Sequence, residues 1–188
     1  MLDCTVIGDV MMDVVMRSDS SIVDALRIDG TNYFSEARVT PGGSGNVAAA
    51  VPWLGGRVAF IGKSGNDTYG RAYREDLESY NVISRIEIDN VAPTGLAVCL
   101  VERSGRRTML VCRGANDKLT PGEVNRNLAE IGRSRFLYLS GYSLVRTPQR
   151  DAILEAARVG RELGSQIVFD PGASNLIRSF PSVFRKAI

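Results

Sequence analysis

The residues best suited to ligand chemistry stand in the short stretch from Pro41 to Asn46. Gly42 and Gly43 have no Cβ, so the backbone there can approach a ligand closely. Asn46 opens an alanine-rich stretch, and its side-chain amide carries both donors and an acceptor. Backbone groups and an amide in this arrangement suit a small molecule with several hydroxyl groups. Gly42, Gly43 and Asn46 are therefore candidates for substrate contact, and the alternatives are a simple turn for the glycine pair and a helix cap for Asn46.

Asp13 is the acidic residue expected to complete this site. The mostly apolar run 2–8 predicts a buried strand of a parallel sheet. Open sheets of this kind bind ligands beyond the carboxyl ends of their strands, and Asp13 follows such an end. An ionised carboxylate there can accept two charge-assisted hydrogen bonds from hydroxyl groups. A solvated loop acid is the alternative for Asp13, whereas Asp9 is better explained as a residue that holds the loop.

Three further polar residues follow strand-like runs, and each has two interpretations. Arg113 and Asn116 come directly after the run 107–112 and could either contact the substrate or anchor the loop. An arginine there matters most for a substrate that carries a phosphate or a carboxylate. Asp170 ends the run 167–170 and either faces the region of the transferred phosphate or caps the turn that follows it.

The elements that must position these residues point to the α/β class. Strand-like apolar runs alternate with helical patterns, above all in the second half of the chain, which implies a parallel sheet with right-handed crossovers. The expected strands lie at 57–62, 136–139 and 167–170, and the expected helices at 44–54, 68–80, 147–163 and 175–188.

Local signals set the ends of several of these helices. Asp67 is expected to cap the helix over 68–80, and Thr120 with Pro121 predicts another helix start. Thr147 is the expected cap of the helix over 147–163. Gly55 follows the small-residue helix as its terminator.

The remaining strand-like runs alternate between apolar and polar residues, as antiparallel strands with one exposed face do. These runs lie at 31–40, 83–88, 95–102 and 107–112, and a glycine-containing turn over 103–106 joins the last two. We assign them to a smaller sheet that forms a lid at one edge of the core. The chain is then a single domain over 1–188, with lid segments at about 14–40 and 83–113 inserted.

Composition excludes several classes of function. The chain has 188 residues, 44% hydrophobic and 23% charged, with a net charge of +2 and scattered basic residues. Such a chain is an ordinary globular protein and shows neither a nucleic-acid footprint nor a polybasic membrane anchor. The apolar run near the N-terminus is interrupted by Asp9 and Asp13, so it predicts neither a signal peptide nor a membrane span.

Histidine is absent and cysteine occurs three times, at positions 4, 99 and 112. The lack of histidine excludes histidine-based zinc sites and catalytic triads, and no metal site is predicted. Each cysteine stands in an apolar run without a CxxC pattern, which is typical of buried thiols in a reducing compartment. We therefore expect a cytoplasmic protein.

A dinucleotide-binding fold is the rival interpretation of the glycine-rich stretch. Residues 43–48 satisfy the pattern GxGxxA, with an acidic residue about 20 positions later. That fingerprint requires a buried parallel strand immediately before it. An alternating run and Pro41 precede it here, which disfavours the dinucleotide interpretation.

Taken together, the motifs resemble those of the ribokinase-like (PfkB) carbohydrate kinase family over almost all of residues 3–172. The resemblance is carried by Gly8 to Asp13, the Gly42, Gly43 and Asn46 set, Gly62, Gly65, Asp67 and Gly70, Pro93 to Gly95, Gly105 to Thr108, Arg113 to Asn116, Leu139 to Tyr142 and Phe169 to Pro171. It implies a ribokinase-like three-layer core with a parallel sheet, cut short at the C-terminus, plus a small β-sheet lid.

The resemblance implies transfer of the γ-phosphate of ATP, with Mg²⁺, to a hydroxyl of a sugar or sugar-like alcohol. Asp13, Gly42, Gly43 and Asn46 would hold the acceptor under the lid, and two lids would clasp each other in a homodimer. Ser140 and Gly141 stand where ribokinases carry a glutamate, which argues against ribose itself as the acceptor.

Two motifs of the family have no match in this chain. One is Asn-x-x-Glu, which does not occur after Asp170, where the family carries it, and the other is the Gly-Ala-Gly-Asp loop whose aspartate acts as the base in the family. No catalytic residue is therefore assigned, and ATP-binding residues are mostly missing. We expect the chain to supply the acceptor-binding part of a sugar kinase, the alternative being a non-catalytic sugar-binding or assembly module.

Overall fold

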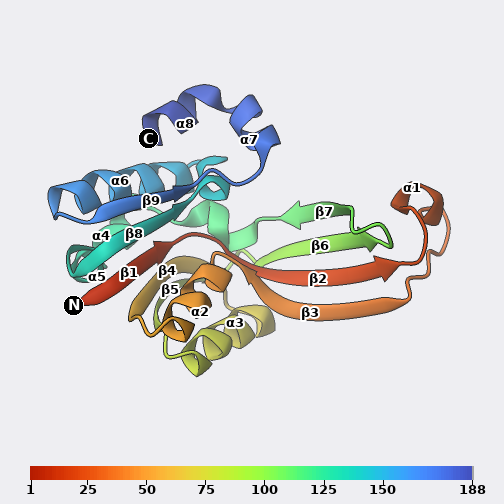
Figure 1. The fold of residues 1–188 in the computed structure, drawn as a ribbon, viewed down its shortest axis with the longest axis horizontal. Coiled ribbons are helices and arrows are strands. Elements are labelled where there is room, and N and C mark those ends of the chain that lie inside the picture. The colour runs from red at the N-terminus through yellow and green to blue at the C-terminus, as the bar shows by residue number, and fades with distance from the viewer. Residues whose placement is uncertain (188) are drawn as a thin grey trace.

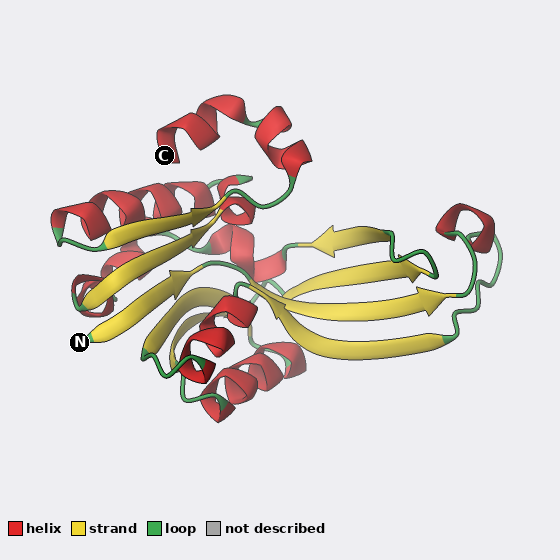
Figure 2. Cartoon of the chain, in the orientation of Figure 1, coloured by secondary structure: helices red, strands yellow, loops and turns green. Residues whose placement is uncertain are grey.

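A computed structural model describes residues 1–187 of the chain, and Figure 1 shows them as a layered core with a long flat extension. The core contains a five-stranded sheet in the order β5-β4-β1-β8-β9. All neighbouring strands in it run parallel, as Figure 2 shows. Its strands are β5 (Ile83–Asp89), β4 (Val58–Gly65), β1 (Leu2–Ile7), β8 (Ser134–Ser140) and β9 (Gln166–Asp170). The predicted α/β class with a parallel sheet is confirmed.

Helices cover both faces of this sheet. One face carries α2 (Gly45–Trp53) and α3 (Thr68–Ser79), and the other carries α4 (Pro121–Asn125), α5 (Leu128–Gly132) and α6 (Gln149–Glu162). Neighbouring side chains of β1 point to opposite faces, so Val6 joins the hydrophobic cluster under α2 and α3 while Ile7 joins the cluster under α6. Burial on both faces explains why β1 reads as a continuous apolar run.

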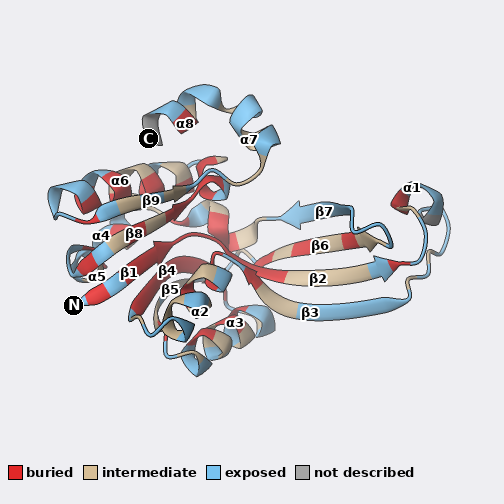
Figure 3. Ribbon diagram, viewed as in Figure 1, coloured by how far each residue is buried: buried red, intermediate tan, exposed pale blue. Residues whose placement is uncertain are grey.

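The extension is a second, four-stranded sheet in the order β3-β2-β6-β7, which corresponds to the predicted lid. It consists of β3 (Glu36–Gly43), β2 (Val10–Ser18), β6 (Gly95–Glu102) and β7 (Arg107–Cys112). In β2, β3 and β6 the residues near the core are more buried than those further out, and β7 is exposed throughout (Figure 3). The short helix α1 (Ile22–Ala25) lies at its far end.

The strand at 83–89 corrects the predicted lid boundaries. It does not join the lid but pairs in parallel with β4, from Ile83 beside Ala59 to Asp89 beside Gly65. As the edge strand of the core sheet, β5 is only partly buried, and partial burial produces the alternating pattern that suggested a lid strand. The lid also begins earlier than predicted, because β2 starts at Val10.

The predicted ends of the helices are confirmed in part. Asp67 caps α3 by accepting a hydrogen bond from the Gly70 amide at 2.8 Å, and Thr120 forms a capping box with Glu123. Thr147 does not cap α6, whose first flanking residue is Pro148.

The C-terminal region also departs from the prediction. The expected helix over 175–188 is divided into α7 (Ser174–Ser179) and α8 (Pro181–Ala187), and Ile188 lies outside the described residues. Pro181 explains the break, because proline lacks the amide hydrogen needed inside a helix but fits its first turn.

Candidate acceptor site

A pocket of about 410 Å³ lies between the lid and the carboxyl ends of β1, β8 and β9. The lid contributes Met11, Asp13, Val15, Ala97, Cys99, Arg107, Met109 and Val111 to its wall. The remaining wall comes from Asp9, Gly43, Ser44, Asn46, Val47, Arg113, Tyr138, Ser140, Tyr142 and Asp170. The pocket therefore occupies the end of the parallel sheet at which α/β proteins bind ligands.

Asp13 presents a half-buried carboxylate to this pocket. Burial raises its pKa above the ordinary value of 3.8. In the described part of the chain, no side chain or main-chain group donates a hydrogen bond to this carboxylate or forms an ion pair with it. A desolvated acid without a partner contributes nothing to the stability of the fold, so its position points to a ligand.

Gly42 and Gly43 have different roles beside Asp13. A Cβ on Gly42 would lie 2.1 Å from the Asp13 Oδ2 atom, so glycine is what lets the carboxylate rest on the main chain. Gly42 itself is buried behind Asp13 and is not part of the pocket wall. Gly43 does line the pocket, with a φ of +59°, which lies in the left-handed region that favours glycine.

Asn46 lies in the first turn of α2. It is exposed, it lines the same pocket as Asp13, and its amide makes no hydrogen bond within the described residues. The structure thus brings Asp13, Gly43 and Asn46 together around one hollow, to which Asp13 and Asn46 contribute unpaired donors and acceptors.

Arg113 touches the pocket, but its guanidinium group is already committed. Its Nη1 and Nη2 atoms donate to the two carboxylate oxygens of Asp9 at 2.9 and 3.0 Å, and its Nε atom donates to Asp117 at 2.6 Å. Asp9 is buried and also accepts from Ser143 at 2.9 Å and Gln149 at 2.7 Å. The anchoring interpretation of Arg113, and the loop-holding interpretation of Asp9, therefore agree with the geometry.

The contacts of Asn116 agree with its anchoring interpretation. It is fully buried and absent from the pocket wall. Its Oδ1 atom accepts from the Val10 amide at 2.7 Å, and its Nδ2 atom donates to the Val10 carbonyl at 2.8 Å. Like a partner strand, the side chain binds both main-chain groups of Val10 and fastens the end of the lid to its beginning.

The contacts of Asp170 agree with its turn-capping interpretation. Its Oδ1 atom accepts from the Gly172 amide at 2.9 Å, which caps the turn, while its Oδ2 atom accepts from the Tyr138 hydroxyl at 2.9 Å. The residue also lines the pocket.

Sequence reasoning missed the apolar wall of the lid. Val15, Cys99 and Met109 lie side by side on three strands and face the pocket. The alternation of the lid strands held this signal, but only the register shows which alternate residues are neighbours.

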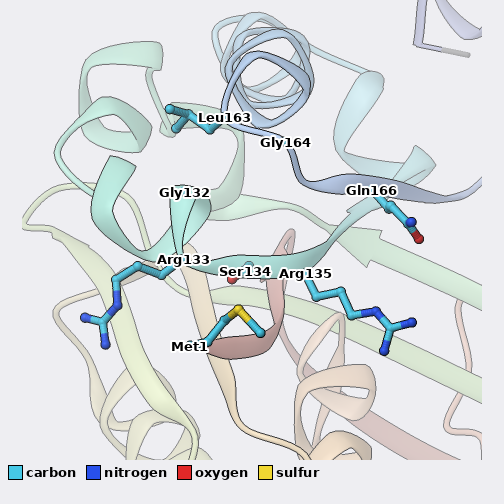
Figure 4. Close-up of a pocket in the computed structure, with 8 residues that line it drawn as sticks. All are labelled: Met1, Gly132, Arg133, Ser134, Arg135, Leu163, Gly164 and Gln166. Atoms are coloured by element: carbon cyan, nitrogen blue, oxygen red, sulfur yellow. The ribbon is translucent and has the colours of Figure 1, made fainter.

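A second hollow, of about 550 Å³, opens at the opposite end of the core sheet (Figure 4). It is lined by Met1, Gly132, Arg133, Ser134, Arg135, Leu163, Gly164 and Gln166. Four of these residues precede or begin strands, so this hollow lies at the amino ends of β1, β8 and β9, where parallel sheets seldom bind ligands. We do not assign it to the site.

The described residues offer neither a metal-binding cluster nor a membrane-spanning helix. Residues 1–187 contain no cluster of three or more acidic, cysteine or histidine side chains able to hold a metal ion. None of the helices in that range has the length and apolar character needed to cross a bilayer.

Comparison with known proteins extends the resemblance to named relatives. The family described as pfkB family carbohydrate kinase matches residues 1–187. A fructokinase from Solanum tuberosum is 36% identical over 152 residues, which cover 79% of this chain and 47% of the relative. A probable fructokinase-2 from Arabidopsis thaliana is 34% identical over the same length, covering 46% of the relative. The chain thus spans about half the length of these curated relatives.

Solved structures agree on the fold. An adenosine kinase from Sinorhizobium meliloti superposes with a TM-score of 0.85 at 27% identity, covering 97% of this chain and 60% of that protein. A putative ribokinase II from E. coli has a TM-score of 0.81 at 22% identity, with 99% and 58% covered. The ribokinase-like fold, with a parallel core sheet and a separate small sheet, is therefore confirmed.

Proposed function

Because the chain belongs to the pfkB family of carbohydrate kinases, we propose that it forms the acceptor-binding part of an ATP-dependent sugar kinase. The proposed reaction transfers the γ-phosphate of ATP to a hydroxyl of a sugar or sugar-like alcohol. One observation carries the proposal: the desolvated Asp13 carboxylate has no partner in the described chain and faces a pocket shared with Asn46.

The roles of the residues follow from their chemistry. Asp13 accepts hydrogen bonds from two acceptor hydroxyls, and the charge makes each bond stronger than a neutral one. Gly43 lets the main chain approach the acceptor, and the Asn46 amide binds a further hydroxyl as donor or acceptor. The apolar lid wall covers the carbon face of the acceptor and keeps water away from it.

ATP and Mg²⁺ are the proposed phosphoryl donor and its metal. When bound, they supply the transferable group and neutralise its charge. The described residues offer no set of ligands for Mg²⁺, so they do not fit the metal by themselves. We derive no step through it and assign no catalytic base within residues 1–187.

Calorimetry with D-fructose, D-ribose and adenosine, each with and without ATP and Mg²⁺, tests this function. We expect at least one of these alcohols to bind the chain, and a coupled assay to detect no phosphorylation by the chain alone. Turnover by residues 1–188 would contradict the proposal that this chain binds the acceptor but cannot phosphorylate it alone. Binding of none of the three alcohols would contradict the acceptor site. Binding with no gain of activity when a relative's C-terminal half is added would favour a non-catalytic sugar-binding module.

The lid also supports a proposal about assembly. Met109, Leu110 and Val111 are exposed at 47%, 59% and 53% on the edge strand β7. Exposed apolar edge strands are usually covered, so we infer a homodimer formed through the lids. Light scattering should give twice the mass of one chain.

The cysteines at 4, 99 and 112 are unpaired, which supports the proposal of a cytoplasmic location.

Replacing Gly42 with alanine should weaken acceptor binding without touching the acceptor directly. The new Cβ would stand 2.1 Å from Asp13 Oδ2, so the carboxylate must move away from its position over the pocket. We expect the affinity for the alcohol that binds best to fall at least about tenfold, equivalent to about 1.4 kcal/mol. Gly122→Ala is the matched control, because its Cβ would meet no atom closer than 4.0 Å. Equal affinity of the two variants would refute the role given to Gly42.

Acceptor binding should also depend on pH through Asp13. Burial raises the pKa of this carboxyl above 3.8, and only the ionised form accepts hydrogen bonds at both oxygens. The affinity for the acceptor is therefore highest at a pH well above the raised pKa of Asp13, and it is lost as the pH falls through that pKa. Calorimetry across that range should show the loss in the natural chain and not in an Asp13→Asn variant, whose weaker affinity should stay constant.

A further inference from the structure

The hydroxyl of Tyr73 is a buried polar group that the acceptor site does not use directly. Tyr73 lies in the middle of α3 and is fully buried. Its ring belongs to the hydrophobic cluster between the core sheet and the helices α2 and α3, with its centroid 6.0 Å from that of Phe60. A buried phenol needs hydrogen-bond partners, and here the closest ones are main-chain groups of the glycine-rich stretch.

That hydroxyl holds both ends of the segment 42–45. It donates to the Gly42 carbonyl at 2.9 Å and accepts from the Gly45 amide at 2.9 Å. Between these two anchors lie Gly43 and Ser44, which line the acceptor pocket. Gly42 rests against the Asp13 carboxylate on one side, and Asn46 follows Gly45 directly on the other. The hydroxyl therefore connects the rigid core to both sides of the site.

Gly45 gives an independent sign that the contact is specific. A Cβ at this position would lie 2.2 Å from the Tyr73 hydroxyl oxygen, so glycine at 45 is what leaves room for that hydroxyl. The start of α2 also has no other side-chain cap, because the Ser44 hydroxyl accepts from the Asp9 amide instead. Without the Tyr73 hydroxyl, the Gly45 amide would lose its partner.

We infer that Tyr73 is a positioning residue of the acceptor site, which sets the turn over 42–45 so that Gly43 and Asn46 face Asp13. This inference rests on the proposed function, because the site that Tyr73 positions is the acceptor site. A tyrosine serving only the core would need its ring and not its hydroxyl.

A Tyr73→Phe variant removes the hydroxyl and keeps the ring. With D-fructose, D-ribose and adenosine as probes in calorimetry, well below the unfolding temperature, we expect at least tenfold weaker binding of the probe that binds the natural chain. Tyr80→Phe is the matched control: Tyr80 follows α3, packs against the same cluster, and its hydroxyl makes no hydrogen bond within residues 1–187. Its affinity should be unchanged.

A second readout needs no ligand. In nitrogen-proton NMR spectra, Tyr73→Phe should shift the Gly45 main-chain amide and the Asn46 side-chain amide, while Tyr80→Phe leaves both in place. The cost of Gly45→Ala should also be smaller in the Tyr73→Phe background, since the clash with the hydroxyl is then gone.

The outcomes separate this inference from the function on which it rests. If the natural chain binds a probe and Tyr73→Phe binds it equally well, the positioning role is overturned while the acceptor site stands. If the natural chain binds none of the three probes, the acceptor-site proposal fails, and the NMR shifts decide whether Tyr73 positions the turn over 42–45. Unshifted amides of Gly45 and Asn46 in Tyr73→Phe would overturn it.

Discussion

Replacing Asp13 with alanine is expected to abolish measurable acceptor binding while leaving the fold intact. Two charge-assisted hydrogen bonds to hydroxyls are lost, each worth about 1.5–3 kcal/mol. The affinity should therefore fall at least about 100-fold, at about 1.4 kcal/mol for each factor of ten. Calorimetry with the alcohol that binds the natural chain measures this loss.

The same substitution should not destabilise the protein. The Asp13 carboxylate is desolvated and has no partner among the described residues, so its ionised form opposes folding. We expect Asp13→Ala to leave the free energy of unfolding unchanged or slightly higher. Asp19→Asn, at an exposed acid just after β2, is the control and should alter neither property. A large loss of stability in Asp13→Ala would mean that Asp13 supports the fold rather than a ligand.

Breaking the ion pair between Asp9 and Arg113 should cause the largest loss of stability. Arg113→Met leaves the Asp9 carboxylate, which is only 4% exposed, without its cation. Removing one partner of a buried ion pair typically costs about 3–5 kcal/mol. Chemical denaturation followed by circular dichroism measures the change.

The exposed pair of Arg17 and Glu36, 3.2 Å apart in the lid, provides the control. Because water surrounds both side chains, Arg17→Met should change the free energy of unfolding by less than about 1 kcal/mol. The double variant Asp9→Asn with Arg113→Met should lose less free energy of unfolding than the two single variants lose together, because each single change already breaks the ion pair. Strict additivity would show that the two side chains are not coupled.

Four side chains hold the lid to the core. Arg113 and Asn116 fasten its end to its beginning, at Asp9 and Val10. Asp67 accepts from the Thr94 amide at 2.7 Å where the chain enters β6, and Tyr73 holds the return from β3 at Gly42. Each place at which the chain passes between core and lid is therefore tied by a buried or partly buried side chain.

Sequence reasoning recovered the features that depend on a few neighbouring residues. The continuous apolar run of β1, the cap at Asp67 and the capping box at Thr120 are local patterns, and the structure contains all three. The assignment of 83–89 failed because an edge strand and a lid strand have the same half-exposed pattern. Only the pairing of β5 with β4 separates them.

The sequence by itself determined the class of the core and part of the pocket wall, namely Asp13, Gly43, Asn46 and Arg113, because hydrophobic periodicity and glycine placement act over short distances. Only the tertiary structure decided what the polar residues do. Arg113 meets Asp9 across 104 positions and Asn116 meets Val10 across 106, so no local pattern could tell an anchor from a ligand-binding group. The fold makes that choice by burying some polar groups against partners and leaving the Asp13 carboxylate without one.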